Sequence, residues 1–539
     1  MTPSRKNSIP ISWLSMLSDQ GIVNPSILAH PYEGEGTPDK PHVVTFFEGD
    51  PRDPMQFSSC LRWFLCIAVG FVTFSVAFIS SAYVSAIPEI ALDFGGNPTV
   101  HTLGLSLFVV GFIVGPFFWA PLSEMYGRQY VLVLSTTAHV SLNIAICLCW
   151  DLKSLLSLRL LSGAFGAAPL TNSGGVIADT FPPRTRGLAI TCFALVPLFA
   201  PVLGPIASGF VAEKMGWRYL MGVMAALSAS SLVVALIGIP ETYAPVLLRK
   251  RAESLRMLTS RAFVPAVDIP IQKDSSRSKA SYMTMLSRPF VLAFHEPIVS
   301  LLALYQAIVF GTVYLTFAAF PIVFNESRGW SQGLGGLAFL GIFVGTLFAV
   351  PFQIWDNKRY VKLLCRRVPH PVPPEARLPS CCIGSVSILL GLLWFACTND
   401  PRIHCLVSIA AGIPFGFGVV LITIGSTNYL VDAYTMFAAS AITVCICGRA
   451  IFGAVFPLFT RALYNKLGIF WGSLVPAILA LICTPLPFVF YYNGHKIRAR
   501  CRYAAQSEEY MRRVRGSLDI EEHTPLLIQS GGAQSEEQI

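Results

Sequence analysis

Apolar runs long enough to cross a lipid bilayer recur along almost the whole chain of 539 residues. A membrane-spanning helix needs about 20 mainly apolar residues, and only helices satisfy every backbone hydrogen bond of a single segment inside a bilayer. Six runs precede a charged stretch at 249–288 and six follow it. They cover residues 62–85, 100–121, 130–149, 155–176, 188–211, 219–239, 297–320, 333–352, 380–396, 403–424, 438–459 and 471–491. The pattern predicts an all-α polytopic membrane protein with twelve transmembrane helices in two pseudo-symmetric six-helix bundles.

Composition agrees with this interpretation, because 53% of the residues are hydrophobic and only 13% are charged. A soluble enzyme of this length would need a larger charged surface. We therefore expect five regions along the chain. They are a cytoplasmic N-terminal tail at 1–60, a bundle at 61–243, a cytoplasmic central loop at 244–288, a second bundle at 289–495 and a cytoplasmic C-terminal tail at 496–539.

Basic residues set the expected orientation. With a cytoplasmic N-terminus, roughly thirty Lys and Arg outside the spans face the cytoplasm and about seven face the other side, as the positive-inside rule requires. The net charge of +9 then reflects contact with the anionic lipid surface, and no nucleic-acid partner is expected. A single N-x-S/T sequon without proline in its middle position, at 325–327, would lie outside, which makes Asn325 a candidate for glycosylation.

Residues that could hold a metal or catalyse a reaction lack a suitable spacing. The fourteen cysteines lie mostly within or beside apolar runs and form no CxxC pair, which favours buried thiols. His295-Glu296 lacks the second histidine of an H-E-x-x-H motif, and no Walker A sequence is present. We expect no enzyme activity, no metal and no cofactor, and an ion gradient as the energy source.

An internal repeat relates the two halves of the chain. With an offset of 230 residues, Gly-Phe-Ile-Val-Gly at 111–115 falls on Gly-Ile-Phe-Val-Gly at 341–345, and Arg128 falls on Lys358. Six-helix halves in the same orientation form the parallel-repeat arrangement of one large transporter class, which binds its substrate between the halves. The alternative is chance similarity between glycine-rich apolar helices.

The loop after the second run carries a glycine, a carboxylate and an arginine at the membrane surface. Gly127 permits a tight turn, and Glu124 and Arg128 can form a charge lock that holds neighbouring helix ends together in one conformation and releases them in another. The alternative is a solvated loop whose charges only set the topology.

Span four contains an arginine, Arg159, within an apolar run. A charged side chain inside the membrane costs a few kcal/mol, about 2.5 or more, so Arg159 should face a cavity or a carboxylate. The alternative is that it extends to the outer interface. A second intramembrane arginine, Arg449 on span eleven, is expected to pair with a carboxylate or with carbonyls at a helix end.

Span five combines prolines and glycines at 197–209, among them Pro201, Gly204, Pro205 and Gly209. Glycine allows close helix packing, and proline removes a backbone hydrogen bond and bends the helix. We expect this helix to shape the contact between the halves. General packing of transmembrane helices is the alternative.

These motifs resemble those of the major facilitator superfamily. In its loop signature G-x-L-x-D-R-x-G-R-R/K, Leu122, Gly127 and Arg128 match, with Glu124 in place of the aspartate. The residues Trp-Ala-Pro-Leu-Ser-Glu at 119–124 and Pro-Leu-Thr-Asn at 169–172 resemble its fungal twelve-helix drug:proton antiporter branch. The resemblance implies a major facilitator fold.

The resemblance also implies roles for two motifs. Arg159 matches an R-x-x-x-G motif that related exporters use in proton transfer, and Gly-Pro-x-x-x-Gly at 204–209 matches the antiporter signature of exporters. Polar residues on or beside spans one, four, seven and ten could line a substrate cavity, although each one could instead only pack or anchor its helix. They are Tyr83, Asn172, Tyr305, Gln306, Tyr314 and Asn428.

The sequence thus predicts a secondary active transporter for proton-coupled efflux of small organic compounds such as drugs, toxins or secondary metabolites. A polyamine or organic-acid transporter on the same fold and a non-transporting membrane receptor are the alternatives. We expect a monomer in the cell membrane, with both termini in the cytoplasm. Glu-His-Thr-Pro-Leu-Leu at 522–527 resembles a sorting signal and leaves a vacuolar or endosomal membrane open.

Overall fold

The computed structural model describes residues 12–18, 20–268, 287–367, 372–507 and 509, so the sorting-like residues 522–527 lie outside the described part. Within it, ten segments are long and apolar enough to cross a membrane. The last, Ala438–Ala499, contains two of the expected spans, because the chain bends at Gly468, where φ is 79°. Helix α7 (Leu152–Thr180) supplies the remaining span, and together these give the expected twelve.

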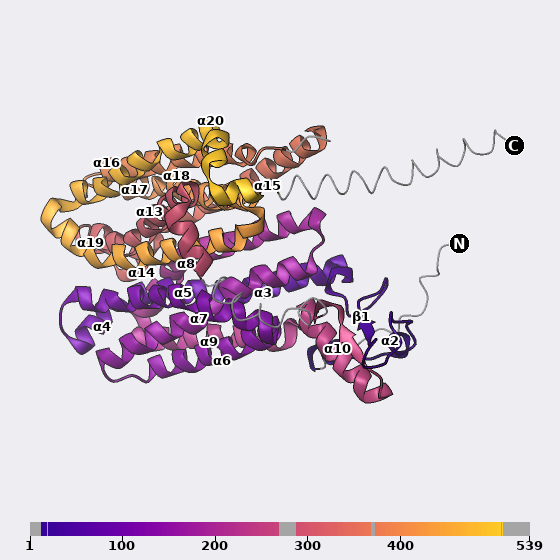
Figure 1. Ribbon diagram of the computed structural model, residues 1–539. Helices are drawn as coiled ribbons and strands as arrows, with labels where there is room; N and C mark the ends of the chain where they lie inside the picture. Colours follow the sequence, from indigo (N-terminus) through magenta and orange to yellow (C-terminus); the bar gives the residue numbers. More distant parts are fainter. Residues whose placement is uncertain (1–11, 19, 269–286, 368–371, 508, 510–539) are drawn as a thin grey trace, which may run out of the picture.

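Figure 1 shows two helical bundles lying side by side, one from each half of the chain. The helices of the first bundle, besides α7, are α3 (Ser59–Ala82), α4 (Ile87–Phe94), α5 (Pro98–Tyr126), α6 (Arg128–Cys147), α8 (Pro183–Met215) and α9 (Trp217–Gly238). The second bundle contains α13 (Pro297–Phe320), the π-helical turn η4 (Pro321–Glu326), α14 (Gln332–Leu337), α15 (Leu340–Arg367), η5 (Pro374–Arg377), α16 (Leu378–Thr398), α17 (Cys405–Ala410), α18 (Gly412–Ala433), α19 (Ala438–Cys483) and α20 (Pro485–Arg500). Pro485 lacks an amide donor and begins a new helix, which divides the predicted twelfth span.

The glycines of the predicted repeat make equivalent contacts in the two bundles. A Cβ atom on Gly111 would collide with the backbone of Ala164 in α7, and one on Gly341 would collide with the backbone of Ile409 in α17. Helix α5 therefore packs on α7 as α15 packs on α17 and α18. This close approach depends on small residues, as is common between membrane helices. The equivalence supports the predicted repeat of the two halves.

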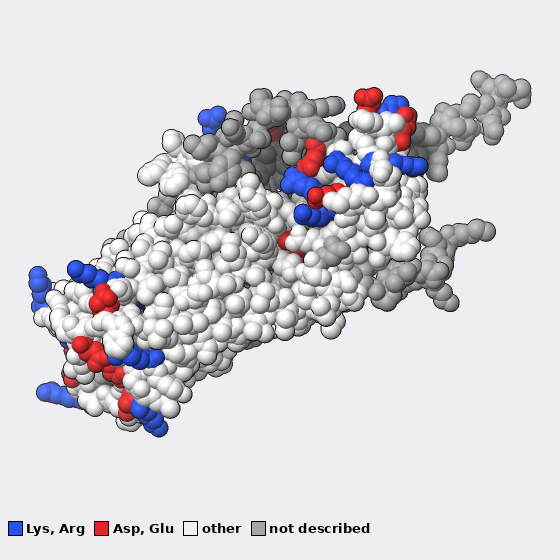
Figure 2. All heavy atoms as spheres, turned by 90° about the horizontal axis from the view of Figure 1, so that it is seen from below, with Lys and Arg blue, Asp and Glu red and all other residues white. Residues whose placement is uncertain are grey.

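Charged side chains gather towards two ends of the molecule in Figure 2, and the broad band between them is almost free of them. Such a band is what the hydrocarbon core of a bilayer requires. We call the end that carries α4, η4 and α14 the distal end, and the end beside α10 (Ala244–Thr259) the proximal end (Figure 1).

The N-terminal region and the central loop fold together at the proximal end, although the sequence suggested two separate regions. Strand β1 (His42–Val44) pairs in parallel with β2 (Phe263–Pro265). Asp50 accepts two hydrogen bonds from Arg251 of α10, at 2.5 and 3.1 Å, and both side chains are almost fully buried. Val44, Leu255 and Phe263 form part of a small apolar core beneath them. The pairing anchors the start of the central loop to the N-terminal region.

Candidate functional site

The two bundles contact each other closely at the distal end, where α8 meets α14. A Cβ atom added to Gly336 would lie 2.5 Å from the carbonyl oxygen of Pro205, and one added to Gly209 would lie 2.9 Å from the carbonyl oxygen of Gln332. Only glycine allows backbone to lie this close to backbone. Two residues of the predicted antiporter motif, Pro205 and Gly209, therefore lie at the interface between the halves.

The other two residues of that motif lie inside the first bundle. A Cβ atom on Gly204 would collide with Ser81 and would lie 2.9 Å from the amide nitrogen of Ala82, so Gly204 packs against α3. Pro201 is buried in α8. The motif thus serves two different contacts, one within the first bundle and one between the bundles.

Hydrogen bonds also cross from one bundle to the other. The Oγ of Ser80 on α3 lies 3.1 Å from the Oη of Tyr314 on α13, and both side chains are buried. The backbone N–H of Gly333 donates to the carboxylate of Glu213 at 2.6 Å. These bonds, together with the glycine contacts, hold the distal ends of the bundles together in this conformation.

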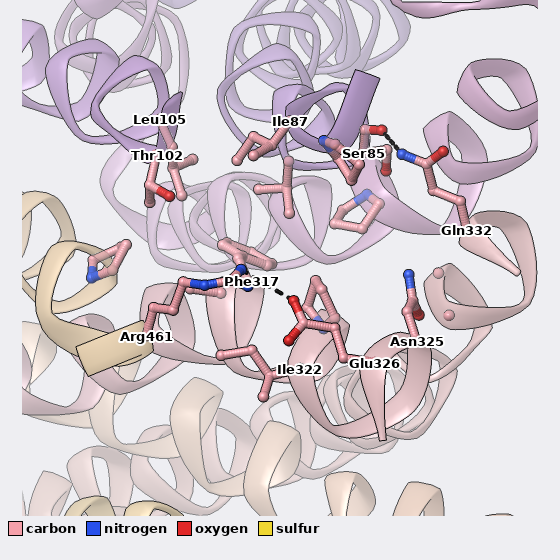
Figure 3. A pocket seen from close by; sticks show the side chains of 18 of the residues that line it. Ser85, Ile87, Thr102, Leu105, Phe317, Ile322, Asn325, Glu326, Gln332 and Arg461 are labelled. Carbon is pink, nitrogen blue, oxygen red and sulfur yellow. Dashed lines mark hydrogen bonds and ion pairs between the residues drawn. The ribbon is translucent and has the colours of Figure 1, made fainter. Parts of the chain in front are cut away.

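A pocket of about 280 Å³ lies at this junction and takes its walls from both bundles. In Figure 3, Ile87, Thr102 and Leu105 of the first bundle face Phe317 and Ile322 of the second. Most of the wall is apolar. The polar and charged groups around it are Ser85, Thr99, Thr102, Asn325, Glu326, Gln332 and Arg461.

Two polar contacts border the pocket. The side-chain amide of Gln332 donates to the carbonyl oxygen of Ser85 and so joins the two bundles (Figure 3). Arg461 and Glu326, both from the second bundle, form an ion pair at 3.0 Å with both side chains partly exposed. An apolar pocket with a few directed polar groups is suited to a small amphipathic molecule.

Asn325 forms part of this pocket wall, which does not suit its predicted glycosylation. It lies in the helical turn η4, and its amide group packs against Gly335, where an added Cβ atom would collide with it. A glycan needs an exposed acceptor in a surface loop. The structure therefore gives Asn325 a role in the wall of the pocket.

Arg159 is fully buried, and in the described part of the chain its guanidinium contacts no carboxylate. The sequence predicted a cavity or a carboxylate, with the outer interface as the alternative. It lies between the rings of Tyr83 and Phe108, with its Cζ 4.6 and 4.3 Å from their centroids. Its donors bond to the backbone carbonyl oxygens of Gly104 at 3.1 Å, Ile79 at 3.4 Å and Ser80 at 3.2 Å. Carbonyl dipoles and aromatic faces replace the expected counter-charge.

The six predicted cavity residues are not equivalent in the structure. Some bond to protein groups: Tyr83 to the carbonyl oxygen of His101, Tyr314 to Ser80 and Gln306 to Ser426. Tyr305 is buried, and Asn428 is half-buried. Asn172 is also buried, and neither polar atom of its side chain bonds to a residue in the described ranges. Buried polar atoms are rarely left without a partner, so Asn172 stays a ligand candidate.

The ionic partner of Arg128 is a carboxylate at the end of span four. Its Nε lies 3.3 Å from Asp179 at the end of α7, and its Nη1 donates to Ser123 at 2.6 Å. Glu124 is exposed and makes no hydrogen bond or ion pair with the residues described. The α-helix turns the Glu124 side chain away from Arg128, because residues four apart share a face only within one continuous helix, and Gly127 interrupts it.

A second carboxylate completes this proximal cluster. Glu241, fully buried after α9, accepts the backbone N–H groups of Arg128 at 2.9 Å and Gln129 at 3.1 Å, so it caps the N-terminus of α6. Gly127 adopts φ 102°, and its missing side chain leaves room for that carboxylate. Burial, and then the charge of Glu124, raise the pKa of the nearby Tyr243, which keeps its phenol neutral.

Both carboxylates could have been recognised in the sequence as acidic residues at the ends of predicted spans, but the prediction of the charge lock did not include them. Asp179 ends span four, and Glu241 stands in Pro-Glu-Thr-Tyr just after span six. Each follows a span whose proximal end lies beside the start of span three. Spatial adjacency of helix ends, not distance along the chain, brings them to Arg128.

The second bundle carries a similar cluster at its proximal end. Arg377, just before α16, pairs with Asp432 at the end of α18 at 3.0 Å and lies 3.4 Å over the ring of Tyr360. Arg128 and Asp179 hold the corresponding positions on α6 and α7 of the first bundle. The counterpart of Arg128 is therefore Arg377, whereas Lys358, chosen by the repeat alignment, is exposed within the longer helix α15.

Comparison with known proteins agrees with this architecture. Residues 69–453 match the family model of the Major Facilitator Superfamily. The multidrug transporter mdrA of Aspergillus fumigatus is 48% identical over 513 residues, covering 94% of this chain and 84% of that protein. An MFS-type efflux pump of Trichophyton rubrum is 45% identical, covering 94% and 85%, and the transporter sorT of Penicillium rubens is 42% identical, covering 90% and 93%.

Solved structures give the fold independently. The xylose transporter XylE from E. coli, in a partially occluded inward-open conformation, superposes with a TM-score of 0.57 at 14% identity, covering 80% of this chain and 98% of that one. Two helical bundles with equivalent contacts, a shared interface and these matches define a transporter scaffold. The chain belongs to the major facilitator superfamily.

Proposed function

We propose that this protein exports small organic compounds across a membrane in exchange for protons, by alternating access of a site between its two halves. The observation that carries the proposal is the pocket at the junction, whose walls come from both bundles. The relatives named as multidrug transporters and efflux pumps, with which it shares 40–48% identity, support export over uptake. We also propose a monomer with both termini in the cytoplasm, in the cell membrane or a vacuolar membrane.

The contacts between the bundles suit such a cycle. At the distal end they consist of a few hydrogen bonds and of packing between glycines, both of which can separate without exposing buried charge. The ion pairs of Arg128 and Arg377 lie within single bundles, so each can move as a rigid unit. Rocking of one bundle against the other around a central site is the motion expected for this class of fold.

Arg159 acts in this proposal as a fixed positive charge that supports coupling. A guanidinium does not lose its proton in proteins, so Arg159 would not itself carry protons across the membrane. Its bonds to carbonyl oxygens of α3 and α5 fix it behind the pocket wall, near Leu105. From there it can bias the binding of a charged substrate or the protonation of a neighbouring group.

Purified protein in proteoliposomes with an imposed pH gradient tests the proposal. We expect accumulation of at least one amphipathic dye when the gradient is present, and none after a protonophore collapses it. The variant Arg159→Ala should lose coupled transport. Because it also leaves three buried carbonyl oxygens without a donor, it should be less stable, so gel filtration must first show that the purified variant is folded. Equal flux with and without a gradient, or full coupling in Arg159→Ala, would contradict the proton-coupled mechanism.

A further inference from the structure

Arg449 lies near the middle of the membrane-spanning part of α19. It is eleven residues beyond Ala438, where the helix begins, which at 1.5 Å per residue places it about 17 Å along the helix axis. That depth is close to half of the roughly 30 Å hydrocarbon core of a bilayer. A guanidinium at this position is costly unless a partner compensates its charge.

The side chain points into the protein and not towards lipid. Cys445 and Gly453, one turn before and after Arg449 on the same helix face, are both buried. Ile451 and Val455, on the opposite face, are exposed. Arg449 itself is only partly buried although it lies on the inner face of the helix.

Aromatic side chains link Arg449 to the interface between the bundles. The Cζ of Arg449 lies 5.8 Å from the centre of the Phe310 ring on α13. The Phe310 ring lies 4.9 Å from that of Tyr314, whose hydroxyl contacts Ser80 of the first bundle. Phe452, three residues further along α19, packs against Gly311, the neighbour of Phe310 in α13.

Among the residues that the structure describes, none neutralises the charge of Arg449. In the part of the chain that the structure describes, it contacts the ring of Phe310 and makes no hydrogen bond or ion pair, whereas Arg159 uses its donors on three carbonyl oxygens. The sequences of α13 and α19 contain no Asp or Glu, and the one carboxylate of α18, Asp432, is paired with Arg377. The centre of the second bundle therefore carries an uncompensated positive charge beside aromatic rings.

We propose that Arg449 is a substrate-binding residue and that the transported compounds are aromatic or amphipathic organic anions, with a carboxylate or phenolate bound by this guanidinium. The inference rests on the proposed export function and specifies its substrate class. An anionic group can take two parallel hydrogen bonds from a guanidinium, which is the strongest pairing that a lone arginine offers. Phe310 and Phe452 would bind the apolar body of the ligand. A cationic compound such as a polyamine would be repelled.

Binding of two dyes of opposite charge tests the proposal. Fluorescein is an anion at pH 7.4, and tetramethylrhodamine methyl ester is a cation with the same xanthene ring system. Fluorescence polarisation with the purified, full-length protein in one detergent gives both dissociation constants, and comparison between variants cancels partition of each dye into micelles. Arg449→Gln should weaken fluorescein binding at least tenfold, and Arg449→Lys should weaken it less. Neither change should weaken binding of the cation.

The control variant Lys466→Gln removes one positive charge from the exposed distal part of α19, and it should leave both affinities unchanged. Gel filtration confirms that each variant is folded. Equal fluorescein affinity in wild type and Arg449→Gln, preference of the wild type for the cation, or no binding of fluorescein overturns the inference. If Arg449→Gln loses fluorescein binding but the wild-type protein moves neither dye into proteoliposomes, the anion site is supported and the proposed export is overturned.

Discussion

Gly127 joins α5 to α6 and makes the cap on α6 possible. Its φ of 102° and ψ of 160° lie in a region that residues with a side chain rarely adopt, and a Cβ atom there would collide with the carboxylate of Glu241. Gly127→Ala therefore has two costs. Backbone strain adds about 1–3 kcal/mol. Displacing the carboxylate removes the charge-assisted hydrogen bonds from the N–H groups of Arg128 and Gln129, each worth about 1.5–3 kcal/mol.

The smallest values of these terms add to about 4 kcal/mol. For a domain of about 150–250 residues, 1 kcal/mol corresponds to roughly 2–4 °C, so the apparent melting temperature of purified Gly127→Ala should fall by about 8–16 °C. Scanning fluorimetry in detergent measures this fall. Coupled transport in proteoliposomes should decline with it, because the cap sets the position of α6 beside α7.

A matched control separates this effect from the general consequences of a methyl group. Gly174 also lies at a helical position of the first bundle, but a Cβ atom there would meet nothing within 4 Å. Gly174→Ala should shift the melting temperature by no more than about 2 °C, as is usual for substitutions in open positions. If Gly127→Ala is as stable as Gly174→Ala, the proposed cap does not contribute and the reasoning is refuted.

Other contacts give predictions of the same kind. Arg159→Lys should lower stability by about 1–3 kcal/mol for each carbonyl oxygen left without a donor and should abolish coupled transport; full activity with lysine would refute a role for guanidinium geometry. Asp50→Ala leaves Arg251 buried without its ionic partner, so we expect this region to lose about 3–5 kcal/mol of stability. Hydrogen exchange in α10, measured by mass spectrometry, should become faster, and unchanged exchange would contradict the prediction. Gly336→Val should destabilise the close contact with Pro205 by about 1–3 kcal/mol, because the larger side chain does not fit there. Cysteines placed at the distal end should then react faster with a thiol label, and an unchanged labelling rate would count against distal closure.

The sequence was a good guide wherever a property depends on local composition. The apolar runs predict the spans because any bilayer segment must meet the same length and polarity requirements. The glycines at 111–115 and 341–345 predict equivalent helix contacts, since close packing needs small residues at that spacing. The resemblance of the loop and span-five motifs was sufficient to recognise the superfamily.

The partners of individual charges were less accessible to such reasoning. Glu124 lies closest to Arg128 in the sequence, yet Asp179 and Glu241 bind it because they lie at the ends of helices that pack beside α6. Arg159 was expected to face a carboxylate or water, but three carbonyl oxygens surround it. Each partner comes from another helix, and its position depends on how the helices are arranged in space.

The sequence by itself determined the class of this protein, a chain of membrane helices in two related halves. It also identified two intramembrane arginines whose charge must be compensated. Tertiary structure alone decided that the N-terminal region pairs with the central loop and that Arg159 bonds to three backbone carbonyl oxygens. It also decided that Arg449 has no hydrogen-bond or ion-pair partner among the residues described. The physical reason is that burial in a bilayer is a property of each segment, whereas compensation of a charge depends on groups that only the packed bundles bring together.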